Sequence, residues 1–167
     1  MTHRLILTRH AKSSWDDPLM DDADRPLNGR GHASARLLGE WMASRGYVPE
    51  QVLCSTALRT KETWAGIAAA MPAQPVITLT EQLYHAEPEQ MLSVLRTASR
   101  KTVLMLGHNP GIGVFAQMLP ATMPIDPGFD HYPTGATLVL EFDIPDWRAA
   151  TPGAGQLLDF VTPRSLE

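Results

Sequence analysis

Two arginines and two histidines stand out because each closely follows a short apolar run of the sequence. Arg9 and His10 come directly after the first run, Arg59 lies shortly after the second, and His108 follows the fourth, over residues 102–107. Arginine guanidinium groups match the geometry of phosphate oxygens. A neutral imidazole can attack phosphorus and carry the phosphoryl group as a phosphohistidine. If the fold brings these residues together, they predict a phosphate pocket in which one histidine is the nucleophile.

The two histidines are expected to play different parts in such a pocket. His10 is the better candidate for the nucleophile because it stands at a predicted strand tip beside Arg9. His108 lies on a glycine-flanked turn and is the better electrostatic partner. Phosphoryl transfer requires mainly charge stabilisation, which the arginines and the second imidazole would supply. The reaction requires no metal ion and no other cofactor.

The apolar runs alternate with segments of helical periodicity, which predicts an α/β domain over residues 1–167. Strand–helix alternation followed by a late hairpin favours a three-layer α/β/α sandwich whose mostly parallel sheet has an antiparallel C-terminal addition. Because ligands bind beyond the carboxyl ends of parallel strands, the four residues are expected to converge at one edge. The expected strands cover residues 3–8, 51–54, 75–79, 102–107, 136–143 and 155–162, and the expected helices cover residues 29–45, 57–71, 87–100 and 110–119.

Two local features complete this outline. Ser55 is expected to be the N-cap of the helix over residues 57–71. Residues 120–135 contain four prolines and two glycines, which predicts an ordered loop.

Composition narrows the possible partners and the compartment. The 167 residues include 14 Lys and Arg against 18 Asp and Glu, a formal net charge of −4, so no broad positive surface points to nucleic acid. No apolar run approaches the ~18 residues that a membrane helix needs, so no membrane partner is expected. The N-terminus shows no secretory leader, and the single cysteine suits a reducing compartment. These features predict a cytoplasmic protein.

Two other kinds of site are less well supported. Cys54 and Arg59 are separated by four residues, one fewer than cysteine-dependent phosphatases need for their phosphate loop, so Cys54 is expected to be a buried structural thiol. The acidic segment 16–25 lacks the glycine and the distal glutamate of an EF-hand loop and is interpreted as solvated. Within that segment, Asp24 and Arg25 are expected to form a local ion pair.

Three stretches of the sequence resemble motifs of the histidine phosphatase superfamily. They are LTRHAKSSW, STALRTKET and LGHNPG, in the order and spacing that the superfamily shows. The stretch DRPLNGRG, the short chain and the lack of a cap insertion are similar to the SixA-type phosphohistidine phosphatases. The resemblance implies a phosphoglycerate mutase-like fold.

The same resemblance implies roles for particular residues. His10 would be the phosphorylated nucleophile. The phosphate pocket around it would be completed by Arg9, Arg59 and His108. Further phosphate or substrate contacts would come from the next residues of the first loop, Lys12, Ser13 and Ser14.

The proton donor departs from the pattern of the larger members. They place a carboxylate after the third strand, where this chain reads TEQLYHAEPEQ. Tyr84 or His85 stands at the expected position, with Glu81 before it and Glu87 after it. His85 is the leading candidate among these four. A missing carboxylate favours a phosphoramidate over an ester, because a P–N bond to imidazole needs less help from a general acid.

The sequence therefore predicts a metal-independent phosphatase acting on phosphohistidine or a similarly activated phosphate, with a phosphorelay protein as its partner. Two alternatives stay open: a phosphatase of small phosphomonoesters such as sugar or nucleotide phosphates, and a non-enzymatic phosphate-binding module. Attack by a neutral His10 beside a charged His108 predicts a bell-shaped pH profile with limbs near the histidine range.

Overall fold

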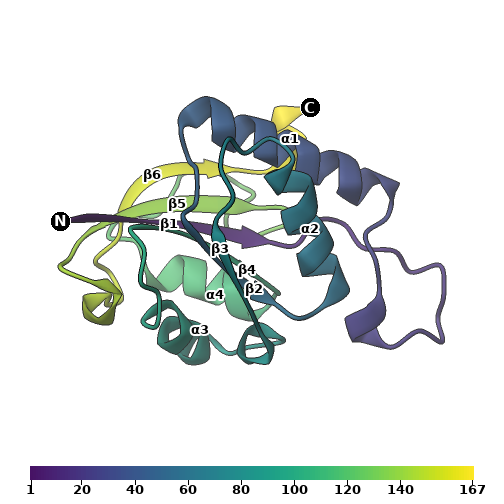
Figure 1. The fold of residues 1–167 in the computed structure, drawn as a ribbon, viewed down its shortest axis with the longest axis horizontal. Coiled ribbons are helices and arrows are strands. Elements are labelled where there is room, and N and C mark those ends of the chain that lie inside the picture. Colours follow the sequence, from purple (N-terminus) through teal and green to yellow (C-terminus); the bar gives the residue numbers. More distant parts are fainter.

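The computed structural model describes residues 1–167 and is built on one six-stranded sheet (Figure 1). The strand order is β3-β2-β4-β1-β5-β6; the first four strands of this order are parallel, and β5 and β6 run antiparallel to their neighbours. This is the mostly parallel sheet with an antiparallel addition that the sequence predicts. The strands are β1 (Thr2–Arg9), β2 (Gln51–Ser55), β3 (Val76–Thr80), β4 (Thr102–Gly107), β5 (Thr137–Asp143) and β6 (Gln156–Val161).

Helices cover both faces of the sheet, which confirms the expected three-layer α/β arrangement. One face carries α1 (Gly29–Arg45), α2 (Leu58–Ala68) and the short α5 (Pro163–Leu166), and the other carries α3 (Pro88–Leu95) and α4 (Gly111–Met118). Three 3₁₀ turns lie between these elements: η1 (Asp22–Asp24), η2 (Glu81–Leu83) and η3 (Trp147–Ala149). None of the helices has the length and apolar character that crossing a membrane requires.

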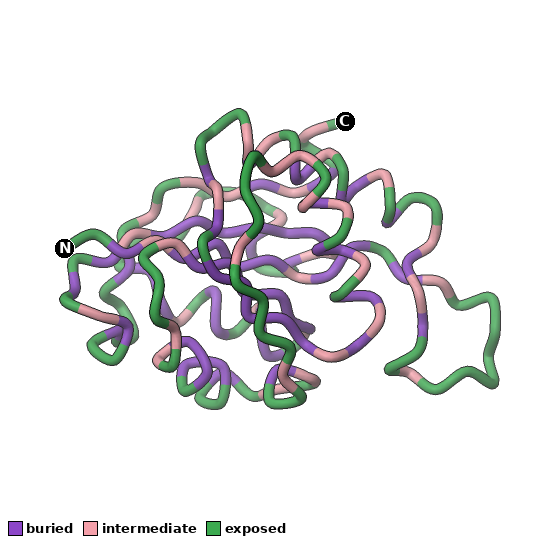
Figure 2. The backbone as a smooth tube through the Cα atoms, viewed as in Figure 1, coloured by how far each residue is buried: buried purple, intermediate pink, exposed green.

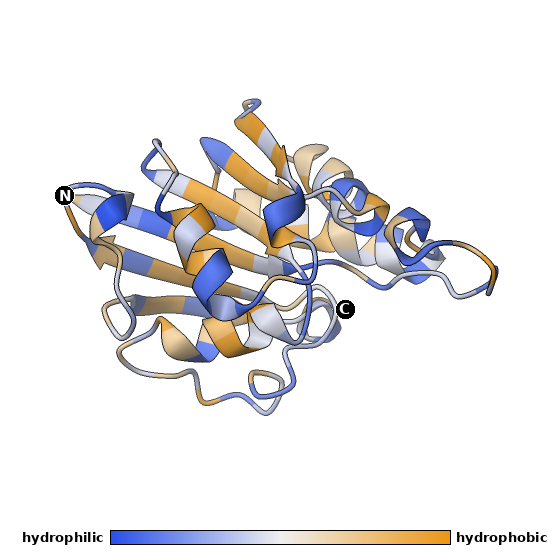
Figure 3. Ribbon diagram, turned by 90° about the horizontal axis from the view of Figure 1, so that it is seen from below, coloured by the Kyte–Doolittle hydropathy of each residue, from blue (hydrophilic) through white to orange (hydrophobic).

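Successive side chains along each strand point to opposite faces of the sheet, and this divides the core into two halves. Leu5 and Leu7 of β1 pack into the larger cluster, on the side of α3 and α4, whereas Ile6 packs toward α1 and α2. The same alternation recurs in β4, where Met105 and Leu104 face opposite sides. The central strands are therefore buried and apolar over most of their length, as Figures 2 and 3 show.

Some predicted boundaries were wrong, for local reasons. The helix expected over residues 87–100 ends at Leu95. The next residues turn toward β4: the Thr97 hydroxyl bonds back to the Val94 carbonyl, and the Gln51 side chain accepts the backbone N–H of Ser99. The helix expected over residues 57–71 spans only Leu58–Ala68.

Ser55 is not the N-cap that the sequence predicts. Ala57 occupies that position and makes no side-chain cap. The Ser55 hydroxyl accepts the N–H of Ala57 at 3.3 Å, but its shorter contact, 2.8 Å, is with His108. Ser55 therefore belongs to the cluster of residues at the strand ends.

The first loop packs closely against the start of α1. A Cβ at Gly31 would lie 2.0 Å from the Lys12 carbonyl oxygen, so only glycine allows this approach. The Asn28 side chain caps α1 by accepting the N–H of Gly31. Arg25 pairs with Asp22, at 3.2 Å, and not with Asp24 as predicted, because the η1 turn brings Asp22 beside it.

Candidate active site

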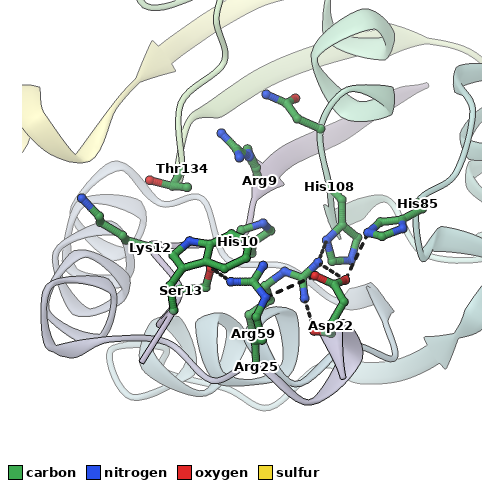
Figure 4. A pocket seen from close by; sticks show the side chains of 12 residues that line it. Arg9, His10, Lys12, Ser13, Asp22, Arg25, Arg59, His85, His108 and Thr134 are labelled. Carbon is green, nitrogen blue, oxygen red and sulfur yellow. Dashed lines mark hydrogen bonds and ion pairs between the residues drawn. The ribbon is translucent and has the colours of Figure 1, made fainter. Parts of the chain in front are cut away.

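A polar pocket of about 360 Å³ lies beyond the carboxyl ends of the parallel strands (Figure 4). It brings together the four residues that the sequence singles out, Arg9, His10, Arg59 and His108. Three further predicted residues, Lys12, Ser13 and His85, also line it, whereas Ser14 does not. The remaining lining residues, which sequence reasoning did not select, are Trp15, Asp22, Arg25, Asn109 and Thr134.

Strand register explains how the two histidines meet. Arg9, the last residue of β1, pairs with Gly107, the last residue of β4. The residue that follows each strand is a histidine, and the backbone N–H of His10 donates to the Gly107 carbonyl at 3.2 Å. The rings of His10 and His108 consequently lie 5.3 Å apart between centroids.

His10 is held in one tautomer by its own loop. Its Nδ1 lies 2.7 Å from the Ala11 carbonyl oxygen, which can only accept, so Nδ1 carries the proton. Burial lowers the pKa of His10 to about 4, and the charges of Arg9, Arg59 and Arg25 add to this effect against the Ala11 hydrogen bond, which raises it. At neutral pH His10 is therefore uncharged, with an unprotonated Nε2.

His108 is fixed from both sides of its ring. Arg59 Nη2 donates to Nδ1 at 3.3 Å, so Nε2 carries the proton and donates to Ser55 Oγ at 2.8 Å. Burial lowers the pKa of His108 to about 3, and neighbouring His10, Arg59 and His85 lower it further. In the free pocket His108 is thus neutral; the charge expected from the sequence requires an anion to offset these neighbours.

Arg9 and Arg59 lie close together in the pocket, and each has an N–H group that no protein atom accepts. Arg59 is 3% exposed, and Arg9 bonds the Tyr132 carbonyl at 3.2 Å. Burial and the charge of Arg59 lower the pKa of Arg9. The Nε atoms of both arginines have no hydrogen-bond partner in the protein. Like charges gathered in this way favour an anionic ligand, and a phosphoryl group fits their chemistry.

Arg25 organises the first loop at the edge of the pocket. Its Nη1 donates to Ser13 Oγ at 2.8 Å and to the Ser14 carbonyl at 3.1 Å. Its guanidinium stacks over the indole of Trp15, 3.6 Å from the ring centroid. Sequence reasoning missed both Arg25 and Trp15, since nothing in the spacing shows that this loop folds back on the strand ends.

Asp22 is the most important residue that the sequence analysis missed, because its segment was interpreted as solvated. Arg59 donates from Nη1 to the Asp22 carbonyl at 2.7 Å and from Nη2 to Oδ2 at 3.0 Å. The hydroxyl of Tyr84 also donates to Oδ2, at 2.5 Å. The one available signal was its place three residues before Arg25, in a stretch where a turn brings the two together.

The segment after β3 brings His85 into the pocket and leaves the glutamates outside. His85 Nε2 lies 3.3 Å from Asp22 Oδ2, and its ring stacks on Tyr84 with 4.1 Å between centroids. Glu81 and Glu87 are exposed and do not line the pocket. Of the four candidate donors, only His85 has a place in the lining, and Tyr84 reaches the pocket through Asp22.

The proline-rich loop closes the opposite side of the pocket. Thr134 of this loop is a lining residue. The Asn109 side chain donates to the carbonyls of His131 and Tyr132, both at 3.1 Å, which ties the loop to the turn that carries His108. Tyr132 is fully buried and donates its hydroxyl to the Leu7 carbonyl.

The structure supports neither a cysteine nucleophile nor a metal site. Cys54 is buried, as predicted, and burial raises the pKa of its thiol to about 12, so a thiolate nucleophile is disfavoured. No group of three or more His, Cys, Asp or Glu side chains is placed to hold a metal ion.

Comparison with known proteins shows the family to which the chain belongs. Residues 5–87 match the profile of the histidine phosphatase superfamily, branch 1. An uncharacterized protein of Mycobacterium tuberculosis strain H37Rv is 32% identical over 163 residues, covering 93% of this chain and 99% of the relative. A Mycobacterium leprae relative is 31% identical over 165 residues, with 93% and 99% covered. The chain belongs to the histidine phosphatase superfamily.

Solved structures of this superfamily share the fold. The SixA protein of Agrobacterium tumefaciens is 29% identical, with a TM-score of 0.79 over 96% of this chain and 98% of that one. The SixA protein of Nakamurella multipartitia is 25% identical, with a TM-score of 0.82 and 98% and 97% covered. The protein histidine phosphatase SixA complexed with tungstate, 22% identical, has the same fold with a TM-score of 0.77 over 98% and 99%. This member of the superfamily is therefore a phosphatase.

Proposed function

We propose that this histidine phosphatase hydrolyses phosphohistidine through a phosphoenzyme formed on His10, without a metal ion. One observation carries the proposal: the Ala11 carbonyl holds the proton on Nδ1, so that Nε2 of a neutral ring is free to attack. His10 is also surrounded by arginines that suit a phosphoryl dianion.

The reaction has two steps. Nε2 of His10 forms a bond to phosphorus as the P–N bond of the substrate breaks. The bonding electron pair goes to the leaving nitrogen, and the substrate imidazole leaves as a neutral ring because its other nitrogen already carries a proton. Water then attacks phospho-His10, releasing inorganic phosphate and returning the electron pair to Nε2. Arg9, Arg59 and His108 stabilise the charge on the phosphoryl oxygens in both steps.

The substrate follows from the acids that the pocket offers. Asp22 is its one carboxylate. Partial burial would raise the pKa of Asp22, but hydrogen bonds from Tyr84 and Arg59 outweigh this effect and hold the pKa far below its usual range. Asp22 therefore has no proton to give, which favours phosphohistidine, whose imidazole leaves as a neutral ring once its second nitrogen is protonated.

A protein substrate is favoured by the space beside the pocket. A second cavity of about 710 Å³ shares Lys12 and Thr134 with it, so a larger molecule has room next to the phosphate site. We take the partner to be a phosphohistidine protein of a phosphorelay. The single buried cysteine agrees with a reducing, cytoplasmic setting.

Hydrolysis of small phosphomonoesters is the second candidate, and one observation favours it. His85 lies in the pocket beside Asp22, where an imidazolium could protonate an ester oxygen. The two candidates differ in the leaving group that the enzyme handles well.

Labelling tests the shared intermediate. Incubation with a radioactive phosphodonor should give label that is labile to acid and stable to base, and His10→Ala should abolish it. His32→Ala, an exposed histidine on α1, is the matched control and should keep the label. Label that persists in His10→Ala would refute the assignment.

A substrate panel separates the two candidate functions. It compares a phosphohistidine peptide, phosphoramidate and ordinary phosphomonoesters on wild type and His10→Ala. Preference for the two P–N substrates supports phosphohistidine hydrolysis, and higher kcat/KM on the esters supports the second candidate.

A further inference from the structure

His85 and Asp22 form a side-chain pair on the wall of the phosphate pocket. Nε2 of His85 lies 3.3 Å from Oδ2 of Asp22. An ionised carboxylate only accepts hydrogen bonds, so Nε2 is the nitrogen that carries a proton. The side chains are 54% and 40% exposed, which leaves the pair open to a bound substrate. Figure 4 shows His85 beside His108, reaching toward Asp22.

The surrounding structure holds both partners in place. Asp22 is fixed by Arg59 and by the Tyr84 hydroxyl, and Tyr84 also stacks on the His85 ring. The backbone of His85 has φ 51°, a left-handed conformation that costs a non-glycine residue on the order of 1 kcal/mol. A Cβ at Gly111 would lie 1.9 Å from the Ala86 carbonyl oxygen, so the start of α4 packs directly against this segment.

We propose that His85, whose Nε2–H is held by Asp22, is the general acid of this phosphatase and that Asp22 is its positioning residue. This proposal rests on the proposed function, because it supplies the proton for the step that forms phospho-His10. Asp22 cannot give that proton itself, since its hydrogen bonds keep it ionised.

The proton moves in a closed cycle. As Nε2 of His10 bonds to phosphorus, the leaving oxygen or nitrogen takes the bonding electron pair and the Nδ1 proton of His85, while the Nε2–H of His85 stays on Asp22. His85 is left neutral, with its lone pair on Nδ1. When water attacks phospho-His10, that lone pair accepts a proton from the water, and His85 is again an imidazolium. No other reactant is needed.

The pair has a measurable consequence for substrate range. A general acid matters most when the leaving group is a strong base, and hardly at all when it is a weak base or already protonated. His85 therefore extends the chemistry of the pocket from phosphoramidates toward esters. The charged and titratable groups that face His85 are Asp22, Tyr84 and His108, with Arg59 behind Asp22.

Leaving-group dependence is the direct test. We would measure kcat/KM for aryl phosphates whose phenols become steadily more basic, and for phosphoramidate. The best variant is His85→Gly, because the positive φ at this position suits glycine and the fold should survive. Its kcat/KM should fall about 100-fold for the most basic phenol and less than about 3-fold for phosphoramidate. Added imidazole should restore activity on the basic phenols.

A double-mutant cycle tests the part of Asp22. Asp22→Asn should steepen the dependence on leaving-group basicity when His85 is present. It should cause no further steepening in His85→Gly, because Asp22 affects the leaving group only through the His85 ring.

Two control variants separate this pair from its surroundings. Glu87→Gln removes an exposed carboxylate outside the pocket and should leave the leaving-group dependence unchanged. Tyr84→Phe keeps the stack on His85 but loses the hydroxyl, and it should have a smaller effect than Asp22→Asn.

The outcomes distinguish this inference from the proposed function. The general-acid role would be overturned if kcat/KM of His85→Gly fell equally on all substrates. It would also be overturned if kcat/KM of the wild type depended on leaving-group basicity as steeply as that of the variant. In both cases labelled phospho-His10 would still form, and the proposed function would stand. Absence of that label in wild type would instead remove the proposed function.

Discussion

Ser55, at the end of β2, and His108, directly after the adjacent strand β4, are joined by a 2.8 Å hydrogen bond between Ser55 Oγ and His108 Nε2. Because Arg59 donates to the other ring nitrogen, the orientation and the tautomer of His108 are both set by the protein. Ser55 is fully buried at the end of β2, where it was expected to cap a helix.

Ser55→Ala should therefore loosen the His108 ring. We expect kcat/KM to fall about 10-fold, because a misplaced group stabilises the phosphoryl oxygens less well. Cys54→Ala is the matched control: it changes the neighbouring buried residue of β2, lowers the free energy of unfolding, and should leave kcat/KM unchanged. Equal losses of activity in both variants would show that only the packing of β2 matters.

Protein stability should fall as the pH drops below neutrality. The unfolded chain protonates its histidines near pH 6.5, whereas the pKa values of His10 and His108 are lowered to about 4 and about 3 in the fold. The unfolded state thus binds more protons between these values, and each histidine should cost about 2 kcal/mol of stability at pH 5 relative to pH 7.

Urea unfolding at pH 7 and pH 5 measures this loss. His10→Asn should reduce the difference between the two pH values, and His32→Asn, which changes an exposed histidine, should not. A stability that is the same at both pH values would contradict the lowered pKa values.

The acid limb of the activity profile should also lie lower than the sequence suggested. Limbs near the ordinary histidine range were expected, but burial and three arginines lower the pKa of His10 to about 4 in the free enzyme. The profile of kcat/KM, corrected for titration of the substrate, should keep His10 active down to about pH 4. An acid limb near pH 6.5 would show that His10 is not the group that titrates.

Arg59→Lys should weaken anion binding strongly. Inorganic phosphate or vanadate at about 100 times its Kd should stabilise the wild type by roughly 2.7 kcal/mol, seen as a rise in Tm. Lysine lacks the planar fork of arginine and also loses the paired contacts to Asp22. Arg36→Lys, an exposed position on α1, should keep the full rise. A full rise in Arg59→Lys would exclude Arg59 from the anion site.

Alanine substitutions at two glycines near the start of α1 should change the free energy of unfolding by different amounts. Gly31→Ala should destabilise the protein by about 1–3 kcal/mol, because its Cβ would meet the Lys12 carbonyl oxygen at 2.0 Å and push the first loop away from the pocket. Gly29→Ala meets nothing within 4 Å and should be neutral or stabilise by up to about 1 kcal/mol. Thermal unfolding of both variants checks the prediction, and similar losses in both would contradict it.

The sequence predicted the parallel strands and the residues at their tips with good accuracy. Leu5 and Ile6 face opposite halves of the core, so a continuous apolar run was a sound signal for a strand buried on both faces. Arg9 and His108 could then be placed at one edge by topology alone, without knowledge of side-chain contacts.

The rest of the site depends on contacts that no local pattern encodes. Asp22 lies in an acidic stretch that resembles any solvated loop, and only its contacts with Arg59 and Tyr84 bring it into the pocket. Ser55 has the sequence context of a helix cap, yet its partner is the histidine that follows the adjacent strand. Hydrogen bonds to residues distant in the sequence, and not local conformational propensity, determine the roles of Asp22 and Ser55.

The central position of β1 has a consequence for biosynthesis. This strand leaves the ribosome before both of its neighbours, β4 and β5, which begin at Thr102 and Thr137. Its hydrogen bonds must therefore wait until most of the chain has been translated, and such long-range pairing slows folding. Nascent chains that end before β5 should bind no vanadate, even though they contain both arginines and both histidines of the pocket.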